Sequence, residues 1–136
     1  MPRWVHSAFW DDLQGMRLLL GHLYHLGHSH VAYLGGRHPG NASKLLAFEQ
    51  ARSELGLQGD VIWCEDESDR FGAGAAMASQ VLALHERPSA LLARHNDFAL
   101  GAIRALEDAG LVVPDDMSVT GYHESWDIAH SRPPLT

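Results

Sequence analysis

Residues that could do chemistry follow a short predicted strand near the C-terminal end of the sequence. Residues 117–120 are apolar or small, as expected for a buried strand, and Gly121 lets the backbone leave that strand. Tyr122, His123 and Glu124 come directly after it. In an open parallel α/β sheet, ligands bind at the carboxyl ends of the strands. We therefore expect His123 and Glu124 to line a ligand site.

Histidines are a second candidate chemical feature, because the chain has 10 of them. His22, His25 and His28 are spaced three residues apart, and His30 follows. Histidines three apart share one face of a helix, so a zinc site could be drawn from them. However, no cysteine or acidic partner is nearby in the sequence, and we predict no metal site here.

Catalytic motifs are incomplete. His123 begins half of a zinc-protease His-Glu-x-x-His motif, but Asp127 stands where the second histidine would be. No Gly-x-Ser-x-Gly elbow is present, and Cys64 lies within a predicted strand, which indicates an inert buried thiol. The glycine loop 35–40 lacks both dinucleotide and P-loop spacing. We predict no catalysis and no cofactor; a small α/β enzyme using His123 and Asp97 as acid and base stays open as an alternative.

Helices and strands alternate along the chain. Apolar residues at helical spacing predict helices over 13–26, 42–55 and 72–86, and a fourth that Asn96 or Asp97 caps and Gly110 ends. Short apolar runs predict strands over 31–34, 61–64, 90–93 and 117–120, with a weaker candidate over 4–9. This alternation is typical of right-handed βαβ units. The fold class is therefore α/β, a Rossmann-like parallel sheet flanked by helices.

Composition places the chain among ordinary globular proteins. Its 136 residues suffice for one domain, and 17 acidic against 10 basic side chains give a net charge of −7, which disfavours direct binding of nucleic acid. The single cysteine excludes a disulfide framework and favours a reducing compartment. No apolar run reaches membrane-spanning length, and residues 1–20 lack the features of a signal peptide. We expect a cytoplasmic protein with no membrane partner.

Several stretches resemble the effector-binding domain of the lactose/galactose-repressor (LacI/GalR) family of transcription regulators. They are HLYHLGHSHVAYLGG (22–36), NASKLLAFEQA (41–51), NDFALGAIRALEDAGLVVPDDMSVTGY (96–122) and PPLT (133–136). The resemblance implies a periplasmic-binding-protein-like fold with two Rossmann-like subdomains. Residues 1–27 would give a strand and helix of the first subdomain, 28–124 the second subdomain, and 125–136 a truncated crossover. The family's helix-turn-helix has no counterpart, so we expect a fragment that binds no operator DNA by itself.

The resemblance also suggests which residues meet a ligand. Lys44 stands where the family usually has arginine, His123 replaces an aspartate, and the family's Asn-Asp pair corresponds either to Asn96-Asp97 or to His95-Asn96. The implied ligand-binding residues are Lys44, Asp69, Asn96, Asp97, His123 and Glu124, with Trp10 and Asp11 facing them from the other subdomain. Leu100, Arg104 and Trp126 are candidates for a homodimer interface.

These assignments imply a function. The effector would be a small polar molecule such as a sugar, bound without reaction. The resemblance is also compatible with a periplasmic-type sugar-binding protein, which shares the fold.

Overall fold

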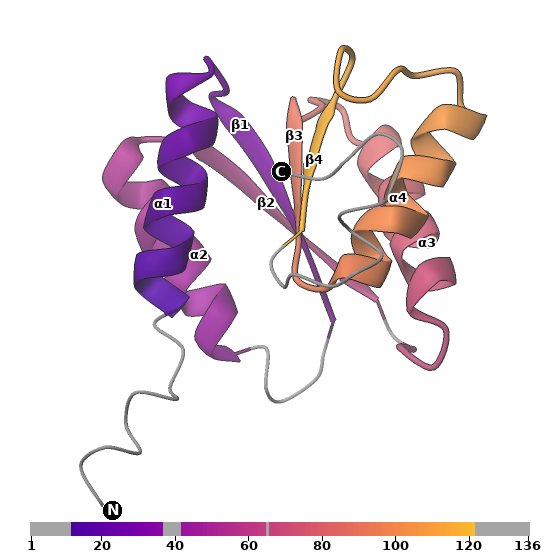
Figure 1. Ribbon diagram of the computed structural model, residues 1–136, viewed down its shortest axis with the longest axis horizontal. Coiled ribbons are helices and arrows are strands. Elements are labelled where there is room, and N and C mark those ends of the chain that lie inside the picture. Colours follow the sequence, from indigo (N-terminus) through magenta and orange to yellow (C-terminus); the bar gives the residue numbers. More distant parts are fainter. Residues whose placement is uncertain (1–11, 37–41, 65, 122–136) are drawn as a thin grey trace, which may run out of the picture.

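Four helices alternate with four strands along the chain. The computed structural model describes residues 12–36, 42–64 and 66–121. The elements are α1 (Asp12–His25), β1 (His30–Gly36), α2 (Ala42–Leu55), β2 (Gln58–Cys64), α3 (Arg70–Leu82), β3 (Ala90–Ala93), α4 (Asn96–Asp108) and β4 (Ser118–Thr120) (Figure 1). The predicted order of elements is confirmed within these residues, whereas the candidate strand over 4–9 lies outside them.

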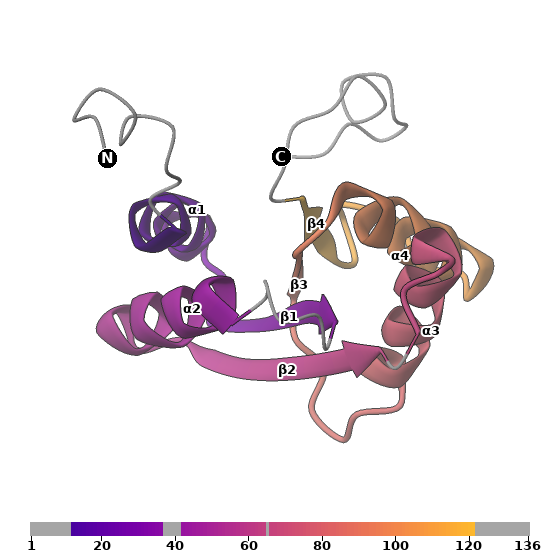
Figure 2. The same cartoon turned by 90° about the horizontal axis from the view of Figure 1, so that it is seen from below.

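The four strands form one parallel sheet in the order β2-β1-β3-β4. The chain leaves β1 toward β2 on one side and returns to β3 on the other, so the strand order reverses between β1 and β3. Helices α1 and α2 cover one face, and α3 and α4 cover the other (Figures 1 and 2). This confirms the predicted Rossmann-like architecture. The point of reversal is where such sheets bind ligands.

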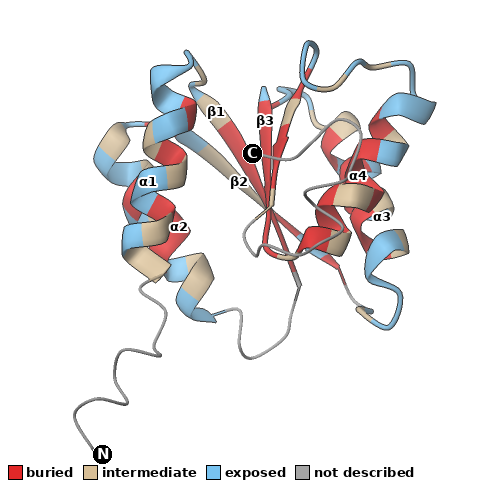
Figure 3. Cartoon of the chain, viewed as in Figure 1, coloured by how far each residue is buried: buried red, intermediate tan, exposed pale blue. Residues whose placement is uncertain are grey.

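Each face of the sheet has its own hydrophobic core (Figure 3). Under α1 and α2, the rings of Tyr33 and Phe48 stack with centroids 5.1 Å apart. Leu20 of α1 is fully buried in this same cluster, so α1 shares a core with the sheet. Under α3 and α4, Met77 and Phe98 are fully buried. How the whole sequence divides into subdomains stays a prediction.

Some element boundaries differ from those predicted. β2 begins at Gln58 rather than residue 61, because its first residues are polar yet pair with β1. α3 covers Arg70–Leu82 instead of 72–86. The predicted helix ends at Gly27 and Gly110 are confirmed. These glycines have φ of 98° and 89°, a conformation that residues with a side chain rarely adopt. No helix in the described part of the chain is long and apolar enough to cross a membrane.

Candidate functional site

Four of the predicted ligand-binding residues lie at the starts of helices that follow the carboxyl ends of strands. Lys44 is in the first turn of α2, Asp69 immediately precedes α3, and Asn96 and Asp97 open α4. Because β1, β2 and β3 are parallel, these helix starts share one edge of the sheet, which we call the carboxyl edge. The other predicted site residues lie outside the described residues: His123, Glu124, Trp10 and Asp11, as does Trp126 of the predicted interface.

Asp69 has a structural role at the start of α3. It is the N-cap of α3, and its Oδ1 accepts a hydrogen bond from the Gly72 backbone amide at 3.0 Å. This bond satisfies one of the free amides at the start of the helix. Asp69 therefore positions α3, and its predicted contact with a ligand remains a prediction.

The start of α4 differs from the prediction, because His95 caps the helix rather than Asn96 or Asp97. His95 is in an extended conformation, and its Nδ1 accepts a hydrogen bond from the Asp97 backbone amide at 3.1 Å. Asn96 becomes the first helical residue and is only 4% exposed. Its Oδ1 has no hydrogen-bond partner among the described residues. An imidazole nitrogen can replace the usual cap oxygen because it too accepts a hydrogen bond.

Arg94, directly before this cap, is a site residue that sequence reasoning missed. It is 8% exposed, and its guanidinium donates a hydrogen bond to Glu67, also missed, from the loop after β2. The guanidinium carbon lies 5.1 Å from the centre of the Phe98 ring, a cation–π distance. Its Nε has no partner among the described residues. The only sequence signal was an arginine at the end of an apolar run, which also fits a strand emerging into solvent.

Positive charges from three elements act on the carboxyl edge. Burial lowers the pKa of His95, and Arg70, Arg94 and Lys44 lower it further, whereas Asp97 opposes them. Burial likewise lowers the pKa of Lys44, with Arg94 adding to the effect and a nearby aspartate opposing it. Thus α2, α3 and the end of β3 bring basic groups toward the start of α4.

Comparison with known proteins identifies the family. The periplasmic binding protein-like domain model matches residues 20–136. The chain belongs to this family. It is 31% identical over 127 residues to the HTH-type transcriptional repressor PurR of Aliivibrio fischeri, which covers 90% of this chain and 38% of that protein. The chain thus spans about two fifths of the length of the curated relatives that it matches.

Solved structures agree and assign the chain to the LacI/GalR effector-binding domains. A dimeric Lac repressor superimposes with a TM-score of 0.84 at 31% identity, covering 93% of this chain and 47% of that one. A sugar-binding transcriptional regulator of the LacI family from Escherichia coli, solved with phosphate, gives 0.80 at 25% identity, covering 93% and 46%. The resemblance inferred from the sequence is confirmed.

In this LacI/GalR domain, close contact between α3 and α4 fixes the carboxyl edge. A Cβ atom on Gly74 would lie 2.1 Å from the Phe98 carbonyl oxygen, and one on Gly101 would lie 1.9 Å from that of Phe71. Only glycine permits such a backbone approach. Phe71 and Phe98 directly follow Arg70 and Asp97, so the contact holds the first turns of both helices together.

The histidine-rich segment of the domain lies at the opposite, amino edge of the sheet. Within the described residues, no group of three or more His, Cys, Asp or Glu side chains could hold a metal ion. His28 instead contacts the hydroxyls of Ser89 and Ser118, and His30 contacts Asp60. Cys64 is buried, and burial raises the pKa of its thiol, as expected for an inert cysteine.

The two described residues of the predicted dimer interface lie on α4. Leu100 is half-buried. Arg104 is exposed, and its Nε is 3.1 Å from Asp108 one turn later. Both are compatible with an interface, which stays a prediction.

Proposed function

We propose that this chain senses a small polar metabolite as the effector-binding part of a LacI/GalR-type transcription regulator. The effector would bind at the carboxyl edge, beside the reversal of strand order between β1 and β3. Binding would change how the domain closes, and a DNA-binding segment of the whole protein would respond to that change.

The observation that carries the proposal is the convergence of Lys44, Arg94 and Asn96 on this edge from separate elements. Arg94 and Asn96 are each more than nine-tenths buried and retain an unpartnered polar atom within the described residues. Buried polar atoms are costly unless they find a partner, so such atoms mark places where a polar ligand gains most. The convergence also coincides with the place where open α/β sheets bind ligands.

Similar proteins support the finer parts of the proposal. The similar repressors act in transcription, which favours a cytoplasmic protein that catalyses no reaction. One similar regulator is described as sugar-binding, so a sugar or a related metabolite is the proposed effector class. The similar Lac repressor is dimeric, and we propose a homodimer that uses the surface of α4 around Leu100 and Arg104.

Binding to the purified chain tests the proposal. We expect isothermal titration calorimetry against a panel of sugars, sugar phosphates and nucleobases to give saturable binding without consumption of the ligand. Lys44→Ala should weaken that binding, whereas Arg87→Ala, which changes an exposed arginine at the opposite edge, should not. Binding that Lys44→Ala leaves unchanged would place the effector elsewhere. Turnover of a ligand would instead favour the enzyme alternative.

DNA binding provides a separate test of the same proposal. The domain is net acidic, and its described helices α1 to α4 pack on the sheet rather than standing free for a groove. We expect no specific retention of operator DNA by this chain at physiological salt in a mobility-shift assay. Specific retention would contradict the assignment of DNA binding to another part of the regulator.

A further inference from the structure

An open pocket with a volume of about 520 Å³ lies at the amino edge of the sheet, between the segments that enter β3 and β4. The two segments are joined by a hydrogen bond of 3.0 Å from the Ser118 amide to the Ser89 carbonyl oxygen. The volume is within the range of about 300–1,000 Å³ that is typical of small-molecule pockets. The lining residues are Arg87, Pro88 and Ser89 before β3, and Leu111, Asp116 and Met117 before β4.

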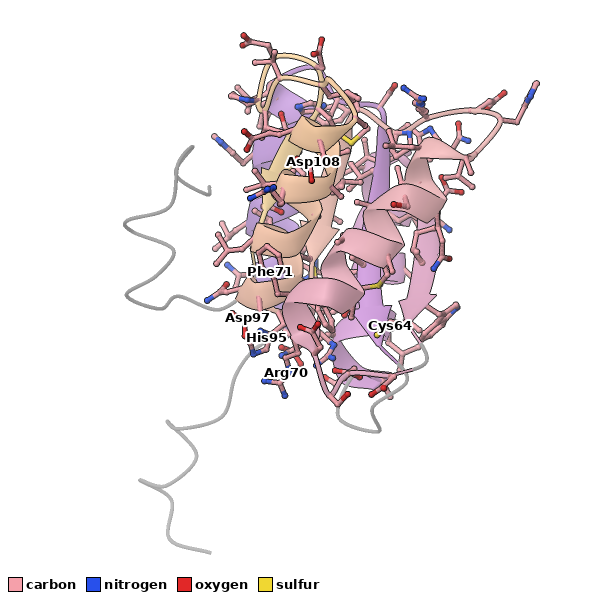
Figure 4. All side chains as sticks on the ribbon, turned by 90° about the vertical axis from the view of Figure 1, so that its right-hand side faces the viewer. Cys64, Arg70, Phe71, His95, Asp97 and Asp108 are labelled. Carbon is pink, nitrogen blue, oxygen red and sulfur yellow. The ribbon has the colours of Figure 1, made fainter. Side chains whose placement is uncertain are left out.

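This pocket is separate from the effector site proposed above. Its lining residue Leu111 comes shortly after Asp108, the last residue of α4. Figure 4 shows Asp108 at the opposite end of α4 from His95 and Asp97, which lie at the carboxyl edge. The 13 residues of α4 span about 20 Å. A small molecule in this pocket would therefore not contact the carboxyl edge.

The inner wall of the pocket is apolar. Pro88 is buried, and Met117 is 2% exposed and belongs to the core under α3 and α4. Leu111 is half-buried and packs against the same core. These side chains offer carbon contacts and no hydrogen-bonding group. They favour a ligand that brings an apolar group out of water.

Two opposite charges lie at the rim of the pocket. Arg87 and Asp116 are exposed, and neither forms an ion pair with a described residue. Nη2 of Arg87 donates to the Leu82 carbonyl oxygen at 3.3 Å, and Oδ2 of Asp116 accepts from the Val112 amide at 2.6 Å. Each side chain keeps further donors or lone pairs for a ligand. Four other arginines are paired with carboxylates: Arg17, Arg52, Arg94 and Arg104.

We infer that this pocket binds a free α-amino acid with an apolar side chain. The ligand carboxylate would pair with Arg87, its ammonium group would pair with Asp116, and its side chain would lie against Leu111 and Met117. A neutral sugar would leave both charges without a partner, and a simple carboxylic acid would leave Asp116 without one. The inference goes beyond the proposed function and does not rest on it, because the two sites are at opposite edges of the sheet.

Nuclear magnetic resonance of the 136-residue chain, labelled with carbon-13 at the methionine methyl groups, tests the site. Met117 lines the pocket, whereas the fully buried Met16 and Met77 do not and serve as internal controls. Met117→Leu identifies the Met117 signal. We expect L-leucine at millimolar concentrations to shift the Met117 signal saturably and to leave the signals of Met16 and Met77 in place.

Three analogues of L-leucine each remove one of the proposed contacts. L-leucinamide lacks the carboxylate, 4-methylpentanoate lacks the ammonium group, and glycine lacks the apolar side chain. We expect the first two to bind about fivefold more weakly than L-leucine, as is typical of one lost ion pair at an exposed position. Glycine should give no saturable shift, because it cannot contact the apolar wall.

Two substitutions assign the charged contacts. Arg87→Gln should weaken the binding of L-leucine about fivefold and abolish the preference for L-leucine over L-leucinamide. Asp116→Asn keeps an acceptor for the Val112 amide, so the turn should persist. It should abolish the preference for L-leucine over 4-methylpentanoate. Arg17→Gln removes an exposed arginine of α1 and should change neither preference.

The outcomes separate this site from the effector site. A Met117 signal that L-leucine leaves unshifted at tens of millimolar would overturn the inference. Equal affinities of the wild type for L-leucine and 4-methylpentanoate, or preferences that Arg87→Gln and Asp116→Asn leave unchanged, would overturn it as well. Lys44→Ala should weaken effector binding and leave L-leucine binding intact. The failure of either site therefore leaves the test of the other one in force.

Discussion

The two ends of the sheet handle their polar side chains in opposite ways. At the amino edge, Nδ1 of His28 lies 2.7 Å from the Ser89 hydroxyl and Nε2 lies 3.3 Å from that of Ser118. A hydroxyl both donates and accepts, so it can match either state of each ring nitrogen. His30 is likewise next to a carboxylate, that of Asp60. The amino edge thus satisfies its own histidines.

The carboxyl edge leaves some of its buried polar atoms without a partner among the described residues. Three buried polar side-chain atoms in the described part of the chain lack a partner, and two of them are Arg94 Nε and Asn96 Oδ1. The His95 ring has hydrogen-bond partners of its own, the Asp97 amide and Arg70. Histidines at both ends are equally visible in the sequence. What separates the two ends is how far their buried polar atoms find partners among the described residues.

The largest expected effect concerns what holds the carboxyl edge together. Gly101→Ala would place a Cβ atom 1.9 Å from the Phe71 carbonyl oxygen, so α3 and α4 must separate. We expect a loss of about 3 kcal/mol in the free energy of unfolding, measured by urea denaturation. Gly21→Ala in α1 is the matched control, because a Cβ there meets nothing within 4 Å. It should stabilise the chain by up to about 1 kcal/mol. Equal effects of the two substitutions would mean that the close approach does not hold the edge.

A smaller loss should follow from unpairing the buried charge at the same edge. Glu67→Gln leaves the guanidinium of Arg94, 8% exposed, without its carboxylate. We expect a destabilisation of about 2 kcal/mol, because an uncompensated buried charge keeps its desolvation cost. Adding Arg94→Met should recover part of that loss, since the charge is then removed as well. Additive losses in the double variant would show that the two side chains do not act as a pair.

These residues mark the limit of what the sequence could predict. The strand over 90–93 and the helix over 42–55 were located at their observed bounds, because uninterrupted apolar runs and helical spacing are local signals. The glycines that end α1 and α4 were local signals as well. The alternation of these helices and strands was then enough to predict a parallel sheet.

The features of the carboxyl edge that the sequence did not predict depend on tertiary contacts. The partner of Arg94 lies 27 residues away, after another strand, so no local pattern announces that the pair is buried. The cap was assigned to Asn96 or Asp97 because those types are common caps, whereas His95 takes the position through one bond to a backbone amide. The capping of α3 by Asp69 was not predicted either, while its predicted contact with a ligand stays a prediction. Which polar groups stay unmatched becomes visible only when the strands lie side by side.

At the amino edge, the matching substitution should cost less than at the carboxyl edge. Asp60→Asn keeps a hydrogen-bond acceptor for His30, and the His30 ring, unlike a guanidinium, carries a charge only when it is protonated. We expect a loss of about 1 kcal/mol in the free energy of unfolding, against about 2 kcal/mol for Glu67→Gln. The same urea series measures both. A larger loss for Asp60→Asn than for Glu67→Gln would contradict the conclusion that the polar groups of the amino edge depend less on one charged partner.

The smallest expected effect is a dependence of stability on pH to which a histidine at each end contributes. Burial lowers the pKa of His28, and burial together with neighbouring cations lowers that of His95. The unfolded chain therefore takes up protons on these rings first as the pH falls below about 6.5. Stability is fully present above that pH and declines as the pH falls through the folded-state pKa values. Urea melts between about pH 7.5 and 5.5 give the free energy of unfolding of the wild type, His28→Asn and His95→Asn. The difference between the wild type and each variant is the contribution of that histidine. Both declines should be present in the wild type, and each substitution should remove only its own part. If neither substitution changes the decline, the lowered pKa values of these two rings do not cause it.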